Sequence, residues 1–192
     1  MGHKNNLTKK TVSANTLYWL KSTVIHYNLC PFANKVYCNS RLVVNVTEAS
    51  TEKQLLEECL LTIQQLLKTP RSEIETILLV HPQAMNDFSE YNDFLGMVDV
   101  LLEKMDLLGI VQVASFHPDY CFANSKPDDA ANFTNRSPYP MLHILREESV
   151  SEVVDEWEER GLNVADIPNK NIETLNKIGS EILADQLSAC FK

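Results

Sequence analysis

Two short apolar runs of this chain end in the same dipeptide, His-Pro. They cover residues 77–82 and 111–118, and both are rich in residues that favour β-strands. A stretch with helical periodicity separates them, and a helix that joins two strands of one sheet usually leaves them parallel. If the runs are parallel neighbours, the imidazoles of His81 and His117 emerge at one carboxyl edge. Open α/β sheets usually bind ligands at that edge, so the pattern predicts where a site lies.

The hydrophobic periodicity of the rest of the chain extends this pattern to a β-α-β-α-β order. A polar region, 118–138, follows, and the strand after it has no intervening helix, so an antiparallel direction is open to that strand. We predict an α/β (or α+β) fold with a compact sheet of about four strands flanked by helices. Strands are expected at 41–47, 75–80, 110–116 and 139–146, and helices at 14–29, 51–68, 86–107, 149–160 and 169–189.

Length and charge narrow the class of protein. The 192 residues fit one domain, and we expect a disordered tail at 1–12 and a single globular domain at 13–192. The net charge of −9 argues against nucleic acid and against an anionic membrane surface as partners. The five scattered cysteines form no CxxC pair and favour a reduced compartment, so we expect a cytoplasmic protein. The oligomeric state stays open.

Several segments together carry a family resemblance. The chain resembles the bacterial family known as domain of unknown function 1415, over about residues 16–185. The resemblance implies a shared architecture and a soluble bacterial protein, and it implies no reaction. It rests on the motifs at 29–33, 79–82, 91–95, 112–120, 128–129, 134–140 and 142–147.

The two strand-end histidines are the first candidates for chemistry. A neutral imidazole acts as a general base or a metal ligand near pH 7, so His117 is a candidate catalytic residue with His81 assisting. The alternative is that each ring is hydrogen-bonded to backbone at a strand-to-loop turn. Asp128 and Asp129 follow in the loop, and Asp129 is a further catalytic candidate. Carboxylates with imidazoles suit a divalent metal such as Zn²⁺ or Mn²⁺, although Pro-Asp-Asp is also a common helix-start signal.

Arg136 is the strongest candidate for ligand binding. It follows Asn135 in a segment stiffened by prolines, and a rigidly presented guanidinium suits the capture of a carboxylate or phosphate. We therefore predict that Arg136, Asn135 and Asp128 bind a small anionic molecule. The alternative is a salt bridge from Arg136 to Asp128 or Asp129 that holds the loop folded.

Cys30 is a candidate nucleophile. If Pro31 is the first residue of a helix, the thiol lies at a helix N-terminus, where the pKa of a thiol falls. If Cys30 instead closes the preceding helix, the dipole acts the other way, and a small packing residue is a further alternative. His143 alternates with apolar residues on its strand, which is typical of a core histidine with a hydrogen-bond partner.

The motifs leave two classes of function open. The chain contains neither a GxGxxG nor a GxxxxGK[ST] sequence, so we expect no nucleotide cofactor, whereas a divalent metal stays open. The first hypothesis is an enzyme that acts on a small anionic metabolite through the His, Arg and Asp residues above. The alternative is non-catalytic binding of a small ligand, or an interaction protein whose 118–138 loop contacts a partner.

Overall fold

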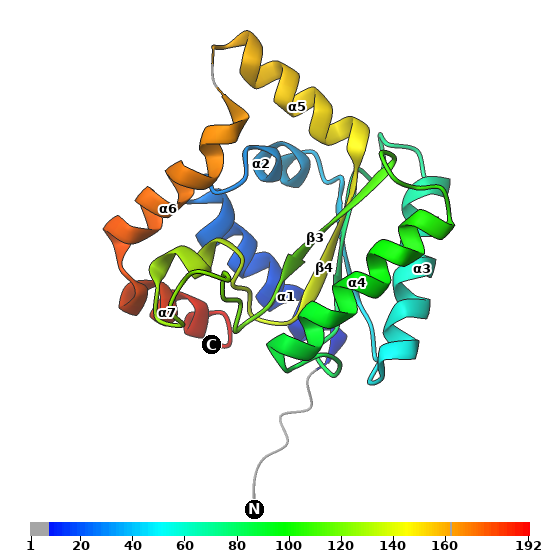
Figure 1. The fold of residues 1–192 in the computed structure, drawn as a ribbon, viewed down its shortest axis with the longest axis horizontal. Coiled ribbons are helices and arrows are strands. Elements are labelled where there is room, and N and C mark those ends of the chain that lie inside the picture. Colours follow the sequence, from blue (N-terminus) through cyan, green and yellow to red (C-terminus); the bar gives the residue numbers. More distant parts are fainter. Residues whose placement is uncertain (1–7, 162) are drawn as a thin grey trace, which may run out of the picture.

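The computed structural model describes residues 8–161 and 163–192, and it contains the expected alternation of helices and strands (Figure 1). The elements in chain order are α1 (Lys9–Trp19), the π-helix η1 (Leu20–Ile25), α2 (Pro31–Cys38), β1 (Leu42–Val46), α3 (Glu52–Lys68), β2 (Thr76–Val80), α4 (Phe88–Lys104), β3 (Val111–Phe116), the 3₁₀-helix η2 (Ala130–Thr134), β4 (Met141–Arg146), α5 (Glu147–Glu159), the 3₁₀-helix η3 (Val164–Asp166), α6 (Ile167–Ile178) and α7 (Ser180–Ala189). No described helix combines the length and apolar character needed to cross a bilayer.

The four strands form one mixed sheet in the order β1-β2-β4-β3. β1 and β2 are parallel, whereas β4 runs antiparallel to both β2 and β3. The two strands that end in His-Pro are therefore not neighbours, because β4 lies between them. They still point the same way, so their carboxyl ends reach the same edge of the sheet, which we call the carboxyl rim.

Both faces of the sheet are covered, as the nearly continuous apolar strands require. Alternation along β2 sends Ile77 and Leu79 to the face under α3 and α4, and Leu78 and Val80 to the opposite face. α1, η1 and α2 cover that second face (Figure 1). The sheet is thus the middle layer between two helical layers, and each layer has its own buried core.

Three expected boundaries were wrong. The chain is helical from Lys9, and Val12 is buried in the core, so the expected tail at 1–12 is too long; residues 1–7 lie outside the described residues. The first helix does not continue to 29, because η1 ends at Ile25 and Pro31 begins α2. The helix expected at 169–189 is two helices, separated at Gly179, whose φ of 91° is a conformation that glycine adopts readily.

A buried carboxylate joins several elements at the edge opposite the carboxyl rim. Glu75, which precedes β2, contacts Arg41 at 2.9 Å and Arg71 at 3.0 Å, and its side chain is only 2% exposed. Arg71 also pairs with Glu152 of α5. These contacts connect the start of β1, the turn before β2 and α5, and they compensate the buried charge of Glu75.

We predict that Glu75→Gln destabilises the protein by about 3 kcal/mol, because it leaves two guanidinium groups without their shared carboxylate. Glu152→Gln is the matched control: its side chain is 52% exposed, so its loss should cost much less than the loss of Glu75. Urea unfolding of both variants measures the difference. Equal losses would show that the burial of Glu75 does not determine the strength of its ion pairs.

Candidate functional site

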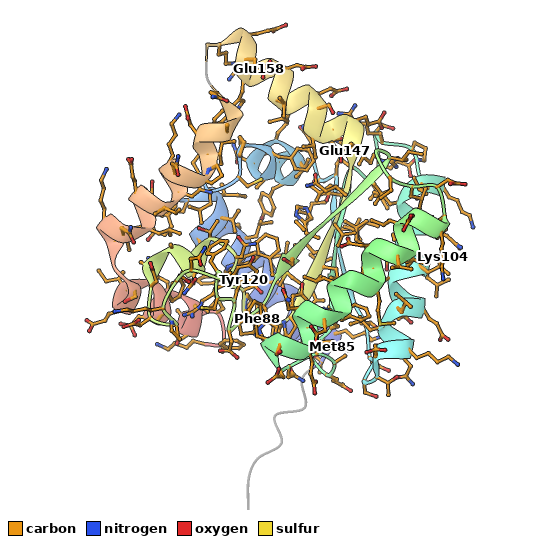
Figure 2. The ribbon with its side chains drawn as sticks, viewed as in Figure 1. Met85, Phe88, Lys104, Tyr120, Glu147 and Glu158 are labelled. Carbon is orange, nitrogen blue, oxygen red and sulfur yellow. The ribbon has the colours of Figure 1, made fainter. Side chains whose placement is uncertain are left out.

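The structure brings His81 and His117 to the carboxyl rim, each at the end of its strand. The backbone N–H of His81 donates to the carbonyl of Pro140 at 3.0 Å, and that of His117 donates to the carbonyl of Asn135 at 3.1 Å. Both side chains are fully buried. Figure 2 shows Met85, Phe88 and Tyr120, which neighbour them, together at this rim. The rim thus holds the two histidines beneath aromatic and loop residues.

Both ring nitrogens of His117 are bonded to backbone. The N–H of Asp119 donates to Nδ1 at 3.0 Å, so Nδ1 carries no proton and Nε2 donates to the carbonyl of Met85 at 3.1 Å. Burial lowers the pKa of His117, and the hydrogen bond to Met85 and the nearby carboxylates of Asp119 and Asp87 oppose this only in part. The neutral ring connects the loop after β2 with the loop after β3.

His81 has one nitrogen bonded and one without a partner. Its Nδ1 donates to the carbonyl of Ala84 at 3.0 Å, whereas Nε2 is buried and forms no hydrogen bond with the described residues. Burial lowers the pKa of His81 to about 4. The ring is therefore neutral at pH 7, and it presents a buried acceptor that nothing in the described chain uses.

Tyr91 of α4 lies between the two histidines. Its ring is 5.8 Å from that of His81 and 5.2 Å from that of His117, measured between centroids. Its hydroxyl donates to the carbonyl of Met141 at 2.8 Å and accepts the N–H of Phe116 at 3.2 Å. Met141 and Phe116 face each other in β4 and β3, so the Tyr91 hydroxyl bridges the two strands at the last pair of their register.

Arg136 holds the long loop through backbone carbonyls. Its Nε donates to the carbonyl of Tyr120 at 3.1 Å and its Nη2 to that of Pro127 at 2.6 Å. Its guanidinium also lies 4.7 Å from the centroid of the Phe133 ring. The ion pairs of the described residues do not include Arg136, so the expected alternative of a salt bridge to Asp128 or Asp129 was wrong in its partner.

The remaining rim candidates also have structural partners. Asn135 donates its amide to the carbonyl of Ser115 at 3.0 Å, and Asp129 caps η2 by accepting the N–H of Ala131 at 2.9 Å. Asp128 is exposed. Within the described chain, no three His, Cys, Asp or Glu side chains gather as a metal would require. The rim geometry thus favours the alternative in which these residues shape the loop.

A cavity on the other face of the sheet brings Cys30 close to His143. It is a space of about 40 Å³ between α1, η1, α2 and the sheet, which we call the inner cavity. A water molecule needs about 10–15 Å³ by this measure, so the inner cavity has room for about three waters. It is lined mainly by apolar side chains: Trp19, Leu20, Val24, Cys30, Phe32, Ala33, Val36, Leu42, Leu78, Phe116 and His143.

His143 has the expected hydrogen-bond partner of a core histidine. Its Nε2 lies 2.8 Å from the hydroxyl of Thr76, and that hydroxyl donates to the carbonyl of Ile144. The Thr76 oxygen must therefore accept, so Nε2 carries the proton and Nδ1 is an acceptor. No described residue donates to Nδ1. Burial lowers the pKa of His143 to about 4, so the ring stays neutral.

The sequence left two positions open for Cys30, and the structure places it at the N-terminus of α2 and not at the end of the preceding helix. It is the N-cap residue of α2, and Pro31 is the first helical residue. Burial nevertheless raises the pKa of the Cys30 thiol, and the amide groups of Phe32 and Ala33 oppose this only in part. The thiol is therefore protonated at neutral pH, which makes it a weak nucleophile and a hydrogen-bond donor.

Comparison with known protein families matches residues 11–185 to the family described as Protein of unknown function (DUF1415). The chain belongs to this family. The match covers nearly the whole domain, including the carboxyl rim and the inner cavity. No curated protein and no solved structure matches the chain. The DUF1415 match thus establishes the family of the chain, and it assigns no function to it.

The sequence analysis considered Cys30 and His143 independently and did not predict that they line one cavity. His143 lies in β4 and Cys30 more than a hundred positions earlier, before α2, and nothing in their spacing indicates a shared cavity. One signal was present: His143 alternates with Met141 and Leu145, which places all three on one face of the strand. That face is the one that α1 and α2 cover.

Buried neutral imidazoles predict a loss of stability in mild acid. The unfolded chain binds a proton at His81 near its ordinary pKa of 6.5, whereas the folded chain binds it only near 4. The unfolded state is therefore favoured as the pH falls from about 6.5 towards 4, by up to about 3 kcal/mol for this group. His81→Asn, whose amide can still donate to Ala84, should reduce the slope in urea unfolding between pH 4 and pH 7. An unchanged slope would contradict the assignment of a neutral, buried ring.

Proposed function

We propose that this protein binds a small, uncharged and mainly apolar molecule in the inner cavity, without a catalytic step. The observation that carries the proposal is the lining of this cavity, in which apolar side chains surround one neutral imidazole and one thiol. Ligand sites in proteins usually combine an apolar wall with a few polar groups that fix orientation. His143 and Cys30 are those groups here.

The chemistry of the lining supports an uncharged ligand. Among the described residues, no Lys, Arg, Asp or Glu side chain lines the inner cavity, so a charged group would lose its hydration without gaining an ionic partner. His143 offers an acceptor at Nδ1 and Cys30 offers a weak S–H donor. A molecule of about three non-hydrogen atoms with one hydroxyl would match both the size and the polarity of the space.

Two features favour binding over catalysis. A general base works best when its pKa lies near the working pH, whereas that of His143 is lowered to about 4. A catalytic cysteine needs its thiolate, whereas burial raises the pKa of the Cys30 thiol. Both groups are therefore suited to hydrogen bonding in their neutral forms.

We predict that ethanol protects Cys30 from alkylation by iodoacetamide. Ethanol has about as many non-hydrogen atoms as the cavity has room for waters, so it should occupy the inner cavity and cover the Cys30 sulfur, whereas the exposed Cys38 should react at the same rate with or without it. Ethanol should also protect Cys30 more than acetonitrile does at equal concentration, because only ethanol has a hydroxyl that can donate to His143 Nδ1. Mass spectrometry of the peptides that contain each cysteine reports the two rates.

His143→Phe is the matched variant for the hydrogen bond, since it keeps an aromatic ring and removes the acceptor. In this variant the advantage of ethanol over acetonitrile should disappear. Equal protection of Cys38 and Cys30, or no protection of either at high ethanol concentration, would rule out binding in the inner cavity.

The carboxyl rim is the basis of a second candidate function. In this candidate the protein is an enzyme that acts on a small anionic metabolite, as the sequence analysis predicts. The observation in its favour is His81 Nε2, a buried acceptor without a partner in the described chain. In this proposal Arg136, Asn135 and Asp128 bind the anion, and His117, His81 and Asp129 act on it. Arg136 would first have to release the carbonyls of Tyr120 and Pro127, which makes this the weaker candidate.

Arg136→Ala separates the two roles of this guanidinium. If Arg136 holds the loop, its loss should destabilise the protein by about 1.5–3 kcal/mol, the range for hydrogen bonds to charged groups, and should speed amide exchange in 118–138. If Arg136 binds anions, the variant should keep its stability and lose any stabilisation by phosphate or citrate. Thermal unfolding with and without these anions distinguishes the outcomes, and we expect the first.

A further inference from the structure

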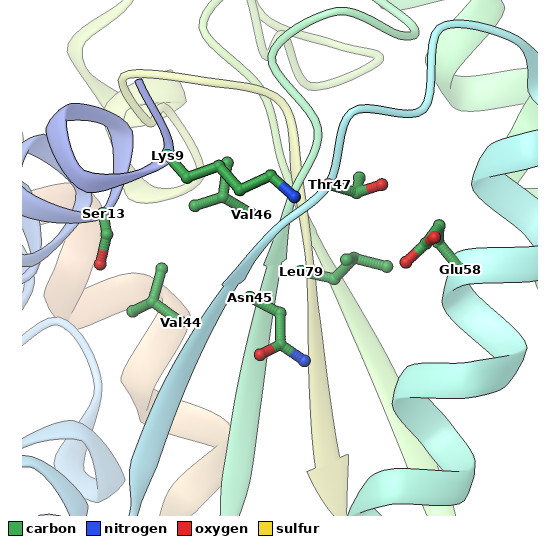
Figure 3. A pocket seen from close by; sticks show the side chains of 8 residues that line it. All are labelled: Lys9, Ser13, Val44, Asn45, Val46, Thr47, Glu58 and Leu79. Carbon is green, nitrogen blue, oxygen red and sulfur yellow. The ribbon is translucent and has the colours of Figure 1, made fainter. Parts of the chain in front are cut away.

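β1 is an edge strand whose outer side is open within the described chain. It pairs only with β2, and α1 and α3 lie on either side of it (Figure 3). A hollow of about 400 Å³ follows this edge, lined by Val44 to Thr47 of the strand region, by Lys9 and Ser13 of α1 and by Glu58 of α3. An unpaired edge of this kind is a template for another strand.

The backbone parity of β1 identifies the groups that face outward. The carbonyl of Arg41 accepts from the chain that begins β2, and the N–H of Thr47 donates to Val80. In a parallel pair, the N–H and C=O groups of alternate residues point to the same side. The odd-numbered residues therefore bond to β2, and Leu42, Val44 and Val46 direct both of their backbone groups to the open edge.

We infer that a second copy of this chain occupies this edge, with the two β1 strands antiparallel about a two-fold axis at Val44. Each outward-facing residue then exchanges backbone hydrogen bonds with its partner: Val44 with Val44 and Leu42 with Val46. Only apolar side chains meet on the face that α1 covers. Such an interface uses the same patch on both copies, which is how two-fold dimers are built.

The charges beside β1 are complementary under this operation. Glu48, Glu57 and Glu58 lie beside the carboxyl end of β1, where they line a second hollow together with Lys9, which pairs with Glu48 at 3.6 Å. At the amino end Arg41 is already paired with the buried Glu75, so the basic group offered to a second copy is Lys68, the last residue of α3. An antiparallel pairing brings Glu57 and Glu58 of one copy towards Lys68 of the other, with Lys68 within reach of Glu57 across the axis.

The same helix carries an exposed apolar residue near the axis. Leu61 is 58% exposed, and it lies between Glu58, which lines the hollow, and Gln65, whose side chain accepts from Asn45 of β1 at 2.8 Å. Two antiparallel α3 helices would cover Leu61 in both copies. A short peptide in the groove would leave Leu61 and Lys68 in solvent, so these residues favour a second copy as the occupant.

Sedimentation equilibrium and amide exchange of the full chain test the dimer together. We expect a mass that rises towards twice 21.8 kDa with concentration, and amides of Val44 and Val46 that become protected over the same range. A monomer at hundreds of micromolar would overturn the proposal and leave the edge to a strand of another protein. A dimer in which these amides stay unprotected would also overturn it.

Charge reversal tests the geometry. Lys68→Glu should weaken the dimer about tenfold, since it removes an attraction and adds a repulsion at both ends of the interface. Glu57→Lys in the same chain should restore it. Lys104→Glu is the matched control, because Lys104 lies in the last turn of α4 just as Lys68 lies in the last turn of α3. If Lys104→Glu weakens the dimer equally, or the double variant stays weak, the proposed arrangement is wrong.

Discussion

The insertion of β4 between β2 and β3 is the constraint on which the rest of the structure depends. A strand that enters antiparallel between two parallel strands must begin at their carboxyl ends. The chain therefore has to turn back at the rim after β3, and the long loop 118–138 is the path of that return. Its backbone groups need partners, and the rim side chains supply them: Arg136 bonds two carbonyls, Asn135 bonds Ser115, and His117 bonds both Met85 and Asp119.

This constraint explains why the rim residues resemble a catalytic site in the sequence. Imidazole, guanidinium and amide groups concentrate at the carboxyl edge in enzymes, and they also concentrate wherever a long loop has buried backbone groups to satisfy. The sequence shows the side chains but not their partners, because a carbonyl of Tyr120 or Pro127 has no signature of its own. The two explanations differ only in what the polar atoms contact. The structure shows these contacts, whereas the spacing of residues along the sequence does not.

The order of helices and strands along the chain was predictable from the sequence, whereas the order of the strands within the sheet was not. Periodicity identified all four strands, because the runs at β2 and β4 are apolar and bounded by Pro, Gly or polar residues. It could not tell that β4 enters between β2 and β3, since either edge of the sheet would accept an apolar strand. The antiparallel direction of β4, which the missing helix left open, was confirmed. The inner cavity escaped prediction for a related reason: its wall combines α1, η1, α2 and all four strands, and no local sequence pattern predicts that these elements meet.

Buried histidines with neutral imidazoles occur on both faces of the sheet. His81, His117 and His143 all have a lowered pKa, and burial is the first cause in each. A buried neutral ring is an oriented pair of one donor and one acceptor, whereas a charged ring would need a carboxylate that none of these positions supplies as a hydrogen-bond partner. His117 uses both atoms within the chain, whereas His81 and His143 each leave an acceptor unused. Of these two, His143 lines the inner cavity, which has room to receive a donor, and this makes the inner cavity the better supported candidate for a binding site.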